Sequence, residues 1–368
     1  MNHTRPEGVL PDNEGSIHAR QYNLDLLKAL AIVCMLFCHP IIRFGEYRPG
    51  YESEFLYFLA DDIIGDYIVA AHGFMFAMGV GMAFSRKSTP KDMICRGFRL
   101  FFLGYVLNFF RYGIYTLGYD IIEGGEISLI TQDSLFCPDI LQFAGLAFIA
   151  TGLFMKLKLK EIPILVISVI LSAIGAMAAF YDTGNTVLNY VCGAFIFAGE
   201  DFSVFCFFNW YIFVAAGILF GKILQKTQDR DLLYKRLIIV SGIICIIYAA
   251  CSCRFGAFFL SKGREYYASS PLEAVGLLSI DLLFLSLFYF LLQKVGASKF
   301  SIPIEMSRNI TSIYFIHWII LGFTESVCCY MLGIVFDYPF IIAYGAALLV
   351  VSFLLARYYD RFRRSRRP

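Results

Sequence analysis

The feature that most constrains this chain is the grouping of its apolar residues into long blocks rather than short alternating runs. A helix needs about 20 consecutive apolar residues to cross the hydrocarbon core of a bilayer. It also satisfies its backbone polar groups internally, which a membrane interior requires. Composition agrees with this interpretation, because 58% of the residues are hydrophobic and only 16% are charged. The sequence therefore predicts an all-α integral membrane protein.

The apolar blocks predict about ten transmembrane helices. They cover Leu24–Ile42, Gly65–Ser85, Gly97–Leu117, Ile140–Met155, Ile162–Tyr181, Phe202–Leu224, Leu237–Cys253, Pro271–Gln293, Asn309–Leu332 and Tyr338–Ala356. The stretch Thr183–Gly199 is also uncharged, but its Gly, Asn and Thr residues favour a re-entrant or interfacial segment. An eleventh crossing there is the alternative.

The distribution of Lys and Arg predicts the orientation. With ten spans both termini lie on one side, and the loops of that side carry most of the basic residues. By the positive-inside rule this side is cytoplasmic. We therefore expect a cytoplasmic tail over residues 1–23, a membrane domain over 24–356 and a basic cytoplasmic tail over 357–368. The first span is expected to be an uncleaved signal anchor, and the location a bacterial plasma membrane.

Two segments give further expectations about the outer side and about covalent links. The outer loop of residues 111–139 contains turn signals, acidic residues and aromatics, which suit a lid over a site. Most of the eleven cysteines fall inside the predicted spans, where Cys acts as a small apolar residue. We predict neither a disulfide framework nor a metal site.

The first span carries two ionisable residues on one face. Lys28 and His39 are eleven residues apart, which is three helical turns plus about 20°. The rise of about 16 Å places Lys28 near the cytoplasmic end and His39 toward the outer half. Asp25 precedes Lys28 by one turn and can pair with it. Histidine suits general-base chemistry because it titrates near neutrality. The alternative is that Lys28 extends to the interface and His39 ends the helix before Pro40.

Other polar residues at bilayer depth are candidates for a site, because such residues are costly and usually functional. His72 lies at a depth similar to His39 and fits either support of His39 or a structural hydrogen bond. Asp281 is an acid in mid-span, and its expected partner is one of the histidines or Arg111. His317 is expected in the inner half of the ninth span. Candidates for substrate contacts are Asn108, Arg111, Asp139, Gln142 and His317.

The cytoplasmic loop before the third span is rich in basic residues. Arg96 and Arg99 are three apart at a helix start and are therefore neighbours on its surface. Positive-inside bias explains most of this charge. Two guanidinium groups at a helix start would also bind phosphate well.

Several of these stretches carry a family resemblance. They are LDLLKALAIVCMLFCH, GFMFAMGVGMAFSR, RGFRLFFLGYVLNFFR, DILQFAGLAF and SRNITSIYFIHW. The chain resembles the transmembrane acyltransferase superfamily, which includes the acyltransferase 3 family and the heparan-alpha-glucosaminide N-acetyltransferase-like proteins. GFMFAMGVGMAFSR and DILQFAGLAF resemble the second branch more. The resemblance covers residues 24–320.

The resemblance implies an O- or N-acetyltransferase that moves an acyl group from cytoplasmic acyl-CoA, usually acetyl-CoA, to a sugar or glycan across the membrane. Acyltransferase 3 proteins show an Arg followed eleven residues later by a His; this sequence matches at His39 but has Lys28 instead of Arg. Arg96 and Arg99 resemble the family's CoA-binding arginine cluster. Implied partners are lipid, acyl-CoA and a glycan, with no nucleic acid and a homodimer left open.

The residues fit this chemistry, which needs a base, donors for an oxyanion and cations for phosphates. His39 would be the base, oriented by Asp281 or His72, and Asn108 or Lys28 would stabilise the oxyanion. The main rival function is a transporter or flippase for a glycan or a lipid-linked intermediate. A second rival is a membrane sensor or scaffold. The sequence does not identify the acceptor.

Overall fold

The computed structural model describes residues 20–68, 71–85 and 89–366, and every regular element in these ranges is a helix. Most of the predicted N-terminal tail, residues 1–19, lies outside the described residues. The first half contains α1 (Tyr22–Gly45), η1 (Tyr51–Ser53), α2 (Phe55–Phe58), η2 (Leu59–Gly65), α3 (Ala71–Ala83), α4 (Pro90–Asn108), η3 (Phe109–Gly113), α5 (Ile114–Glu123), α6 (Leu129–Phe136), α7 (Ile140–Lys156), α8 (Glu161–Ala178) and α9 (Thr186–Gly193). The second half contains α10 (Phe207–Lys226), α11 (Arg230–Phe255), η4 (Lys262–Arg264), α12 (Pro271–Val295), η5 (Ala297–Phe300), α13 (Ser301–Arg308), α14 (Ile310–Thr324), η6 (Glu325–Met331) and α15 (Tyr338–Ser365).

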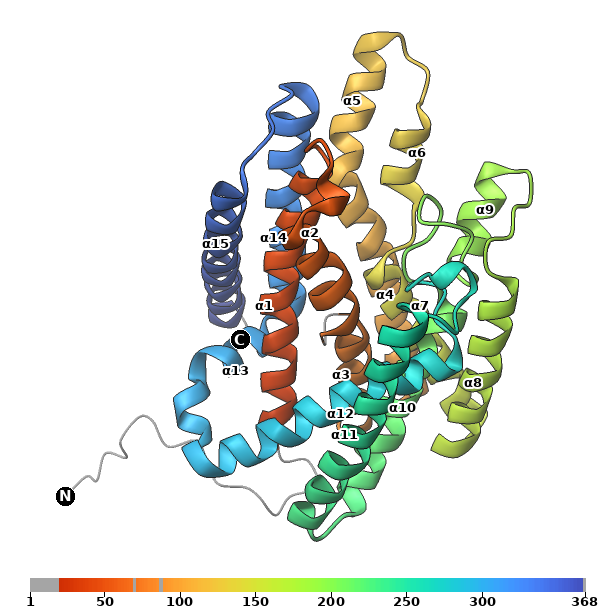
Figure 1. Ribbon diagram of the computed structural model, residues 1–368, viewed down its shortest axis with the longest axis vertical. Coiled ribbons are helices and arrows are strands. Elements are labelled where there is room, and N and C mark those ends of the chain that lie inside the picture. The colour runs from red at the N-terminus through yellow and green to blue at the C-terminus, as the bar shows by residue number, and fades with distance from the viewer. Residues whose placement is uncertain (1–19, 69–70, 86–88, 367–368) are drawn as a thin grey trace, which may run out of the picture.

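The helices confirm the predicted class, an all-α integral membrane protein. Within the described ranges, nine helical segments are long and apolar enough to cross a membrane. The remaining predicted span corresponds to α3, an apolar helix of 13 residues. At 1.5 Å per residue α3 is about 20 Å long, shorter than a hydrocarbon core of about 30 Å. Figure 1 shows the spans side by side as one bundle, with α1 near its middle.

The outer segment expected as a loop is helical instead. α4, η3 and α5 form one continuous helical segment from Pro90 to Glu123, and α6 runs back beside α5 (Figure 1). Apolar residues continue the helical pattern beyond Arg111, which explains the extension. The chain reverses at Gly124 and Gly125, whose φ values of 149° and 87° suit glycine. Residues 111–139 therefore form a helical hairpin.

The segment Thr183–Gly199 agrees with the favoured re-entrant or interfacial interpretation, whereas the C-terminal boundary differs from the sequence prediction. The segment of residues 183–199 contains only the eight-residue helix α9, so it does not cross the membrane. The basic tail expected from residue 357 is mostly a continuation of α15, which runs to Ser365. Its alternating basic and aromatic residues are good enough helix formers to extend the last span into the aqueous phase.

Small residues let the central helices pack with their backbones almost touching. A Cβ atom on Gly79 of α3 would lie 2.1 Å from the Val214 carbonyl oxygen of α10. A Cβ atom on Gly217 would lie 2.2 Å from the Phe76 carbonyl oxygen. Close contacts of this kind are a main source of helix association in membranes. They fix α10 against α3 at the centre of the bundle.

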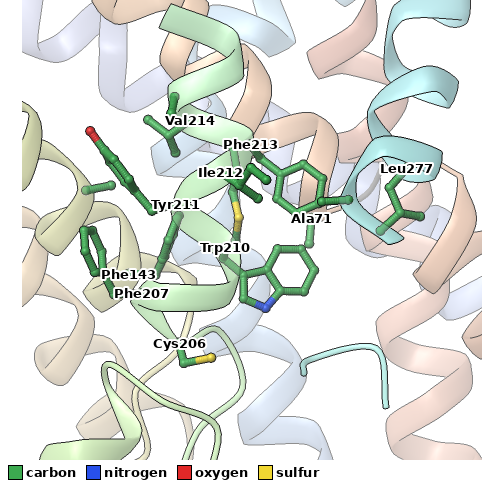
Figure 2. Close-up of a cluster of buried hydrophobic side chains, with 14 of the residues drawn as sticks. Ala71, Phe143, Cys206, Phe207, Trp210, Tyr211, Ile212, Phe213, Val214 and Leu277 are labelled. Atoms are coloured by element: carbon green, nitrogen blue, oxygen red, sulfur yellow. The ribbon is translucent and has the colours of Figure 1, made fainter. Parts of the chain in front are cut away.

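Aromatic side chains fill the space around α10. Figure 2 shows Trp210, Phe213 and Tyr211 of this helix packed with Phe143 of α7 and Leu277 of α12. These five side chains are fully or almost fully buried. A second apolar cluster joins α1, α14 and α15. The site described below lies where α1 and α14 meet η3.

Candidate functional site

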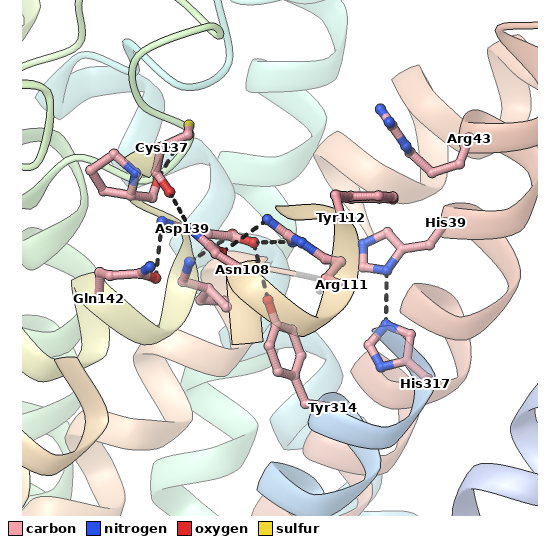
Figure 3. Close-up of polar contacts among 12 residues, drawn as sticks. His39, Arg43, Asn108, Arg111, Tyr112, Cys137, Asp139, Gln142, Tyr314 and His317 are labelled. Atoms are coloured by element: carbon pink, nitrogen blue, oxygen red, sulfur yellow. Dashed lines mark hydrogen bonds and ion pairs between the residues drawn. The ribbon is translucent and has the colours of Figure 1, made fainter. Parts of the chain in front are cut away.

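Two histidines from distant parts of the chain meet between α1 and α14. His39 Nδ1 lies 3.1 Å from His317 Nε2, and the rings stack with centroids 5.3 Å apart (Figure 3). His317 is fully buried, whereas His39 is half-buried. The contact places His317 level with His39, rather than nearer the cytoplasmic end as expected. It also gives His39 a partner that differs from the expected Asp281 or His72.

The surrounding hydrogen bonds define the neutral tautomer of each ring. His317 Nδ1 lies 3.2 Å from the Ile313 carbonyl oxygen, which only accepts, so this nitrogen carries a proton. Neutral His317 therefore presents Nε2 as an acceptor, and His39 Nδ1–H must donate to it. The proton of His39 is thus held on Nδ1. Its Nε2 keeps a free lone pair, which is the form that a general base needs.

A tryptophan separates His39 from a buried arginine. The Trp318 ring centroid is 4.3 Å from that of His39, and the Arg111 guanidinium lies 4.6 Å from the centroid of the same indole. Arg111 Nε has no acceptor among the described residues, whereas the Trp318 indole interacts with the Tyr314 hydroxyl. Unpaired buried donors are uncommon in folded proteins. The unpaired Arg111 N–H leaves this corner of the site able to bind an oxyanion.

Arg111 is fixed by the start of α7. Its Nη1 donates to Asp139 Oδ2 at 2.7 Å and its Nη2 donates to Asn108 Oδ1 at 3.2 Å (Figure 3). Asp139 is the N-cap of α7, and Gln142 completes the capping box by accepting from the Asp139 backbone N–H. Tyr314 also donates to Asp139. Four of the five predicted substrate contacts, Asn108, Arg111, Asp139 and Gln142, therefore lie together in one hydrogen-bonded group. The fifth, His317, contacts His39 instead.

Asn108 is not free to act as an oxyanion donor. Its amide Nδ2 donates to the Cys137 carbonyl oxygen at 2.9 Å and to the Leu135 carbonyl oxygen at 3.3 Å. Both of its N–H groups are therefore engaged. Asn108 instead joins the end of α4 to the break between α6 and α7.

A close helix contact sets the distance between Arg111 and the histidines. A Cβ atom on Gly322 of α14 would lie 2.2 Å from the Arg111 carbonyl oxygen. Only glycine allows this approach without moving one of the helices. Gly322 therefore holds η3 against the helix that carries His317 and Trp318.

Sequence reasoning missed a second ion pair beside His39. Arg43, one turn after His39 on α1, donates to Glu325 at 2.8 Å, and Tyr112 donates to Glu325 at 2.7 Å. The i, i+4 spacing from His39 could have drawn attention to Arg43. Nothing near Glu325 in the sequence indicated its partner. Directly after α1, burial raises the pKa of the Glu46 carboxyl above its usual value, and Arg43 opposes that shift.

His72 and Asp281 form a separate pair elsewhere in the bundle. His72 Nδ1 lies 2.9 Å from Asp281 Oδ1, and both side chains are fully buried. The expected partnership of Asp281 with a histidine is confirmed, but the histidine is His72. No contact links this pair to His39 in the part of the chain that the structure describes. The pair joins α3 to α12.

The predicted cofactor residues lie at the opposite end of α1. Lys28 is half-buried and forms no ion pair within the described ranges. Among the charges that act on it, the attraction of Asp25 is the largest, and Arg20 and Arg96 oppose it. Arg96 packs over the Phe148 ring at 4.4 Å. Arg99 is exposed. Asp25, which was expected beside Lys28, forms its ion pair with Arg20. Arg20 Nε lies 2.5 Å from Asp25 Oδ2, and Arg20 Nη2 donates to Asp25 Oδ1.

Comparison with known proteins identifies the family. Residues 20–248 match the family model described as heparan-alpha-glucosaminide N-acetyltransferase, catalytic. No curated protein matches the chain. The match spans more than half of the chain and includes Lys28, His39, Arg111 and Asp139, while His317 lies beyond its end. The chain thus belongs to the heparan-alpha-glucosaminide N-acetyltransferase catalytic family and is a multi-pass membrane acetyltransferase.

Proposed function

We propose that this protein transfers the acetyl group of cytoplasmic acetyl-CoA to a hydroxyl or amino group of a sugar on the other side of a bacterial plasma membrane. The observation that carries the proposal is the contact of His39 with His317. Family membership supports acetyl transfer. The asymmetry of the basic residues favours cytoplasmic termini, with Lys28 at the cytoplasmic end of α1.

His39 is the proposed general base. Its Nε2 takes the proton of the acceptor hydroxyl or amine as that group attacks the thioester carbonyl carbon. The carbon–sulfur bond then breaks, and the same proton passes to the leaving thiolate, which returns as the thiol of CoA. His317 supports both steps because its Nε2 accepts from His39 Nδ1 and stabilises the imidazolium.

The Arg111 N–H beside Trp318 is the proposed oxyanion site. The tetrahedral intermediate carries a negative oxygen that needs fixed N–H groups or cations nearby. Arg111 Nε is unpartnered among the described residues, and Trp318, whose indole also interacts with the Tyr314 hydroxyl, lies between Arg111 and His39. Arg111 replaces Asn108 in this role, since the Asn108 amide is engaged. Asp139 holds Arg111 in place.

The two substrates are proposed to approach the site from opposite ends of α1. Lys28 and Arg96, whose charges act on each other, would meet the acyl-CoA from the cytoplasmic end. Arg43 and Glu325, with Tyr112, line the outer side of His39 and suit the hydroxyl groups of a sugar. His72 and Asp281 lie outside this path, so their proposed role is to hold the bundle together.

Acetyl transfer by the purified protein tests the proposal. The protein in detergent is incubated with acetyl-CoA and a panel of sugars, and both CoA thiol release and acetylated sugar are measured. We expect turnover that His39→Asn abolishes, with the variant still folded by its melting temperature. His72→Asn is the matched control, in which the same substitution is made at a histidine outside the proposed reaction path.

The outcomes separate the rival functions. Loss of turnover in His72→Asn but not in His39→Asn would overturn the assignment of the base. A wild-type protein that neither binds nor turns over acetyl-CoA, yet moves a glycan across vesicles, would support the flippase instead.

A further inference from the structure

A cavity outside the proposed reaction path lies between α13 and the C-terminal end of α15. Its volume is about 460 Å³, and it is lined by four arginines, Arg308 from α13 and Arg357, Arg361 and Arg364 from α15. Figure 1 shows α13 beside the end of α15 that carries the C-terminus. The size falls within the range of small-molecule pockets.

The polar lining comes from matched helical faces. On α15 the residues at positions 357, 360, 361 and 364 repeat at i, i+3, i+4 and i+7, so they share one face. On α13, Ser301, Glu305 and Arg308 face them in the same way. Two amphipathic faces therefore border one open cavity and direct their polar side chains toward it.

The cavity has an excess of positive charge. Its four arginines are opposed by two carboxylates, Glu305 and Asp360. Arg357 pairs with Glu305 at 2.9 Å, and Arg364 pairs with Asp360 at 2.6 Å. In the described structure, Arg308 and Arg361 pair with no carboxylate. Two guanidinium groups are left for a ligand.

Topology alone does not account for this arrangement. The positive-inside rule explains basic residues after a last span, but it does not require them to converge. Here they face an arginine from another helix, together with the hydroxyl groups of Ser298 and Ser301 and the amide of Asn309. Guanidinium groups with hydroxyl and amide donors form the usual environment of a bound phosphate.

The cavity is connected to the proposed catalytic site through two helices. α13 is tied to the start of α1, since Arg20 donates to the Ile304 carbonyl oxygen and Ser307 donates to Asp25. Asn309, which lines the cavity, directly precedes α14. His317 follows eight residues later, a rise of about 12 Å along the helix. A ligand in the cavity would thus lie at the donor end of the helix that holds the histidine pair.

We propose that this cavity binds phosphate groups, with Arg308 and Arg361 as the two free cations that contact them. Two sources present this chemistry at the cytoplasmic face, the phosphates of coenzyme A and the headgroup of an anionic phospholipid. The first source rests on the proposed function, and the second does not.

The test is the double variant Arg308→Gln/Arg361→Gln in lipid nanodiscs. Its matched control is Arg363→Gln/Arg366→Gln, which removes the same charge from arginines of the same helical end that do not line the cavity. Affinity for coenzyme A is measured by calorimetry in phosphatidylcholine nanodiscs. Retention of phosphatidylglycerol is measured by native mass spectrometry. Melting temperatures confirm that both variants are folded.

We expect one of the two affinities to fall about tenfold or more in the cavity variant and to stay near wild type in the control. A fall for coenzyme A identifies the donor as the source, and a fall for phosphatidylglycerol identifies the lipid. If neither falls, or if the control loses as much, the cavity is not a phosphate site. Because binding is measured without turnover, a protein that binds phosphate here but transfers no acetyl group would refute the proposed function alone.

Discussion

The contact between Gly322 and Arg111 allows a test of the catalytic geometry that removes no functional side chain. In Gly322→Ala the new Cβ atom would lie 2.2 Å from the Arg111 carbonyl oxygen, where real Cβ contacts are essentially never shorter than 3.0 Å. The two helices must therefore separate by roughly 1 Å. α14 carries His317 and Trp318, so both side chains move with it.

The size of the effect follows from the histidine contact. The distance of 3.1 Å between His39 and His317 would grow to about 4 Å, beyond hydrogen-bonding range. A misplacement of about 1 Å can cost on the order of 100-fold in rate. Overpacking should also destabilise the bundle by about 1–3 kcal/mol. We therefore expect kcat for acetyl transfer to fall about 100-fold, with a lower melting temperature in detergent.

Gly118→Ala provides the matched control. Gly118 lies in α5, and a Cβ atom there meets nothing within 4 Å. Alanine favours helix more than glycine does, so this variant should melt at or slightly above the wild-type temperature. Its turnover should be unchanged. Wild-type kcat and melting temperature in Gly322→Ala would refute the argument that this contact sets the geometry of the site.

Three further changes test other parts of the structure. His317→Phe should lower kcat by about 100-fold or more, because His39 loses its hydrogen-bond acceptor. His317→Gln should recover part of the lost kcat through its amide oxygen, and the KM for acetyl-CoA should change little. Equal kcat values for the two variants would contradict the role of His317 as an acceptor. Asp139→Asn should destabilise the protein by about 3 kcal/mol or more, because it leaves the buried Arg111 charge uncompensated. The melting temperature measures this loss, and an unchanged melting temperature would argue against a structural ion pair. Burial and the neighbouring carboxylates of Asp62 and Glu265 raise the pKa of Asp61, on the segment before α3, to about 6. The folded state then binds the Asp61 proton more tightly than the unfolded chain does, so the stabilisation from this proton is present below pH 4 and is lost as the pH rises through 6. In Asp61→Asn the melting temperature should therefore depend less on pH between pH 4 and 7. An equal pH dependence of the melting temperature in wild type and variant would exclude Asp61 as the cause.

The spans were predictable because each depends on a local property, the length of an apolar block. All ten predicted blocks contain or overlap a helix, although the one at residues 65–85 is shortened to α3. The helical hairpin of residues 111–139 was not predictable in the same way. Its charged and glycine residues suggested a loop, whereas in the structure the Asp120 carboxylate accepts from the Ser128 backbone N–H and closes a tight turn between two helices. The sequence pattern did not show that these two residues meet.

The site was predictable as a set of residues but not as a set of pairs. The cost of polar groups in a membrane singled out His39, His317, Arg111 and Asp281 one at a time. The pairing of these groups depends on how helices that are far apart in the sequence pack together. His39 and His317 are 278 residues apart, and His72 and Asp281 are 209 residues apart. The sequence therefore offered several partners for each histidine. Helix packing selects among them.

The residues of the candidate site come from two parts of the chain. The part of the chain that matches the family, residues 20–248, carries His39, Arg111 and Asp139, and the remainder carries His317, Trp318 and Glu325. Without α14, His39 would have no acceptor for Nδ1–H, and either ring nitrogen could hold the proton. Arg43 would also lose Glu325, its most buried partner. The matched region thus contains the proposed base and the cation, and the C-terminal helices contribute the partners that fix the tautomer of His39 and pair with Arg43.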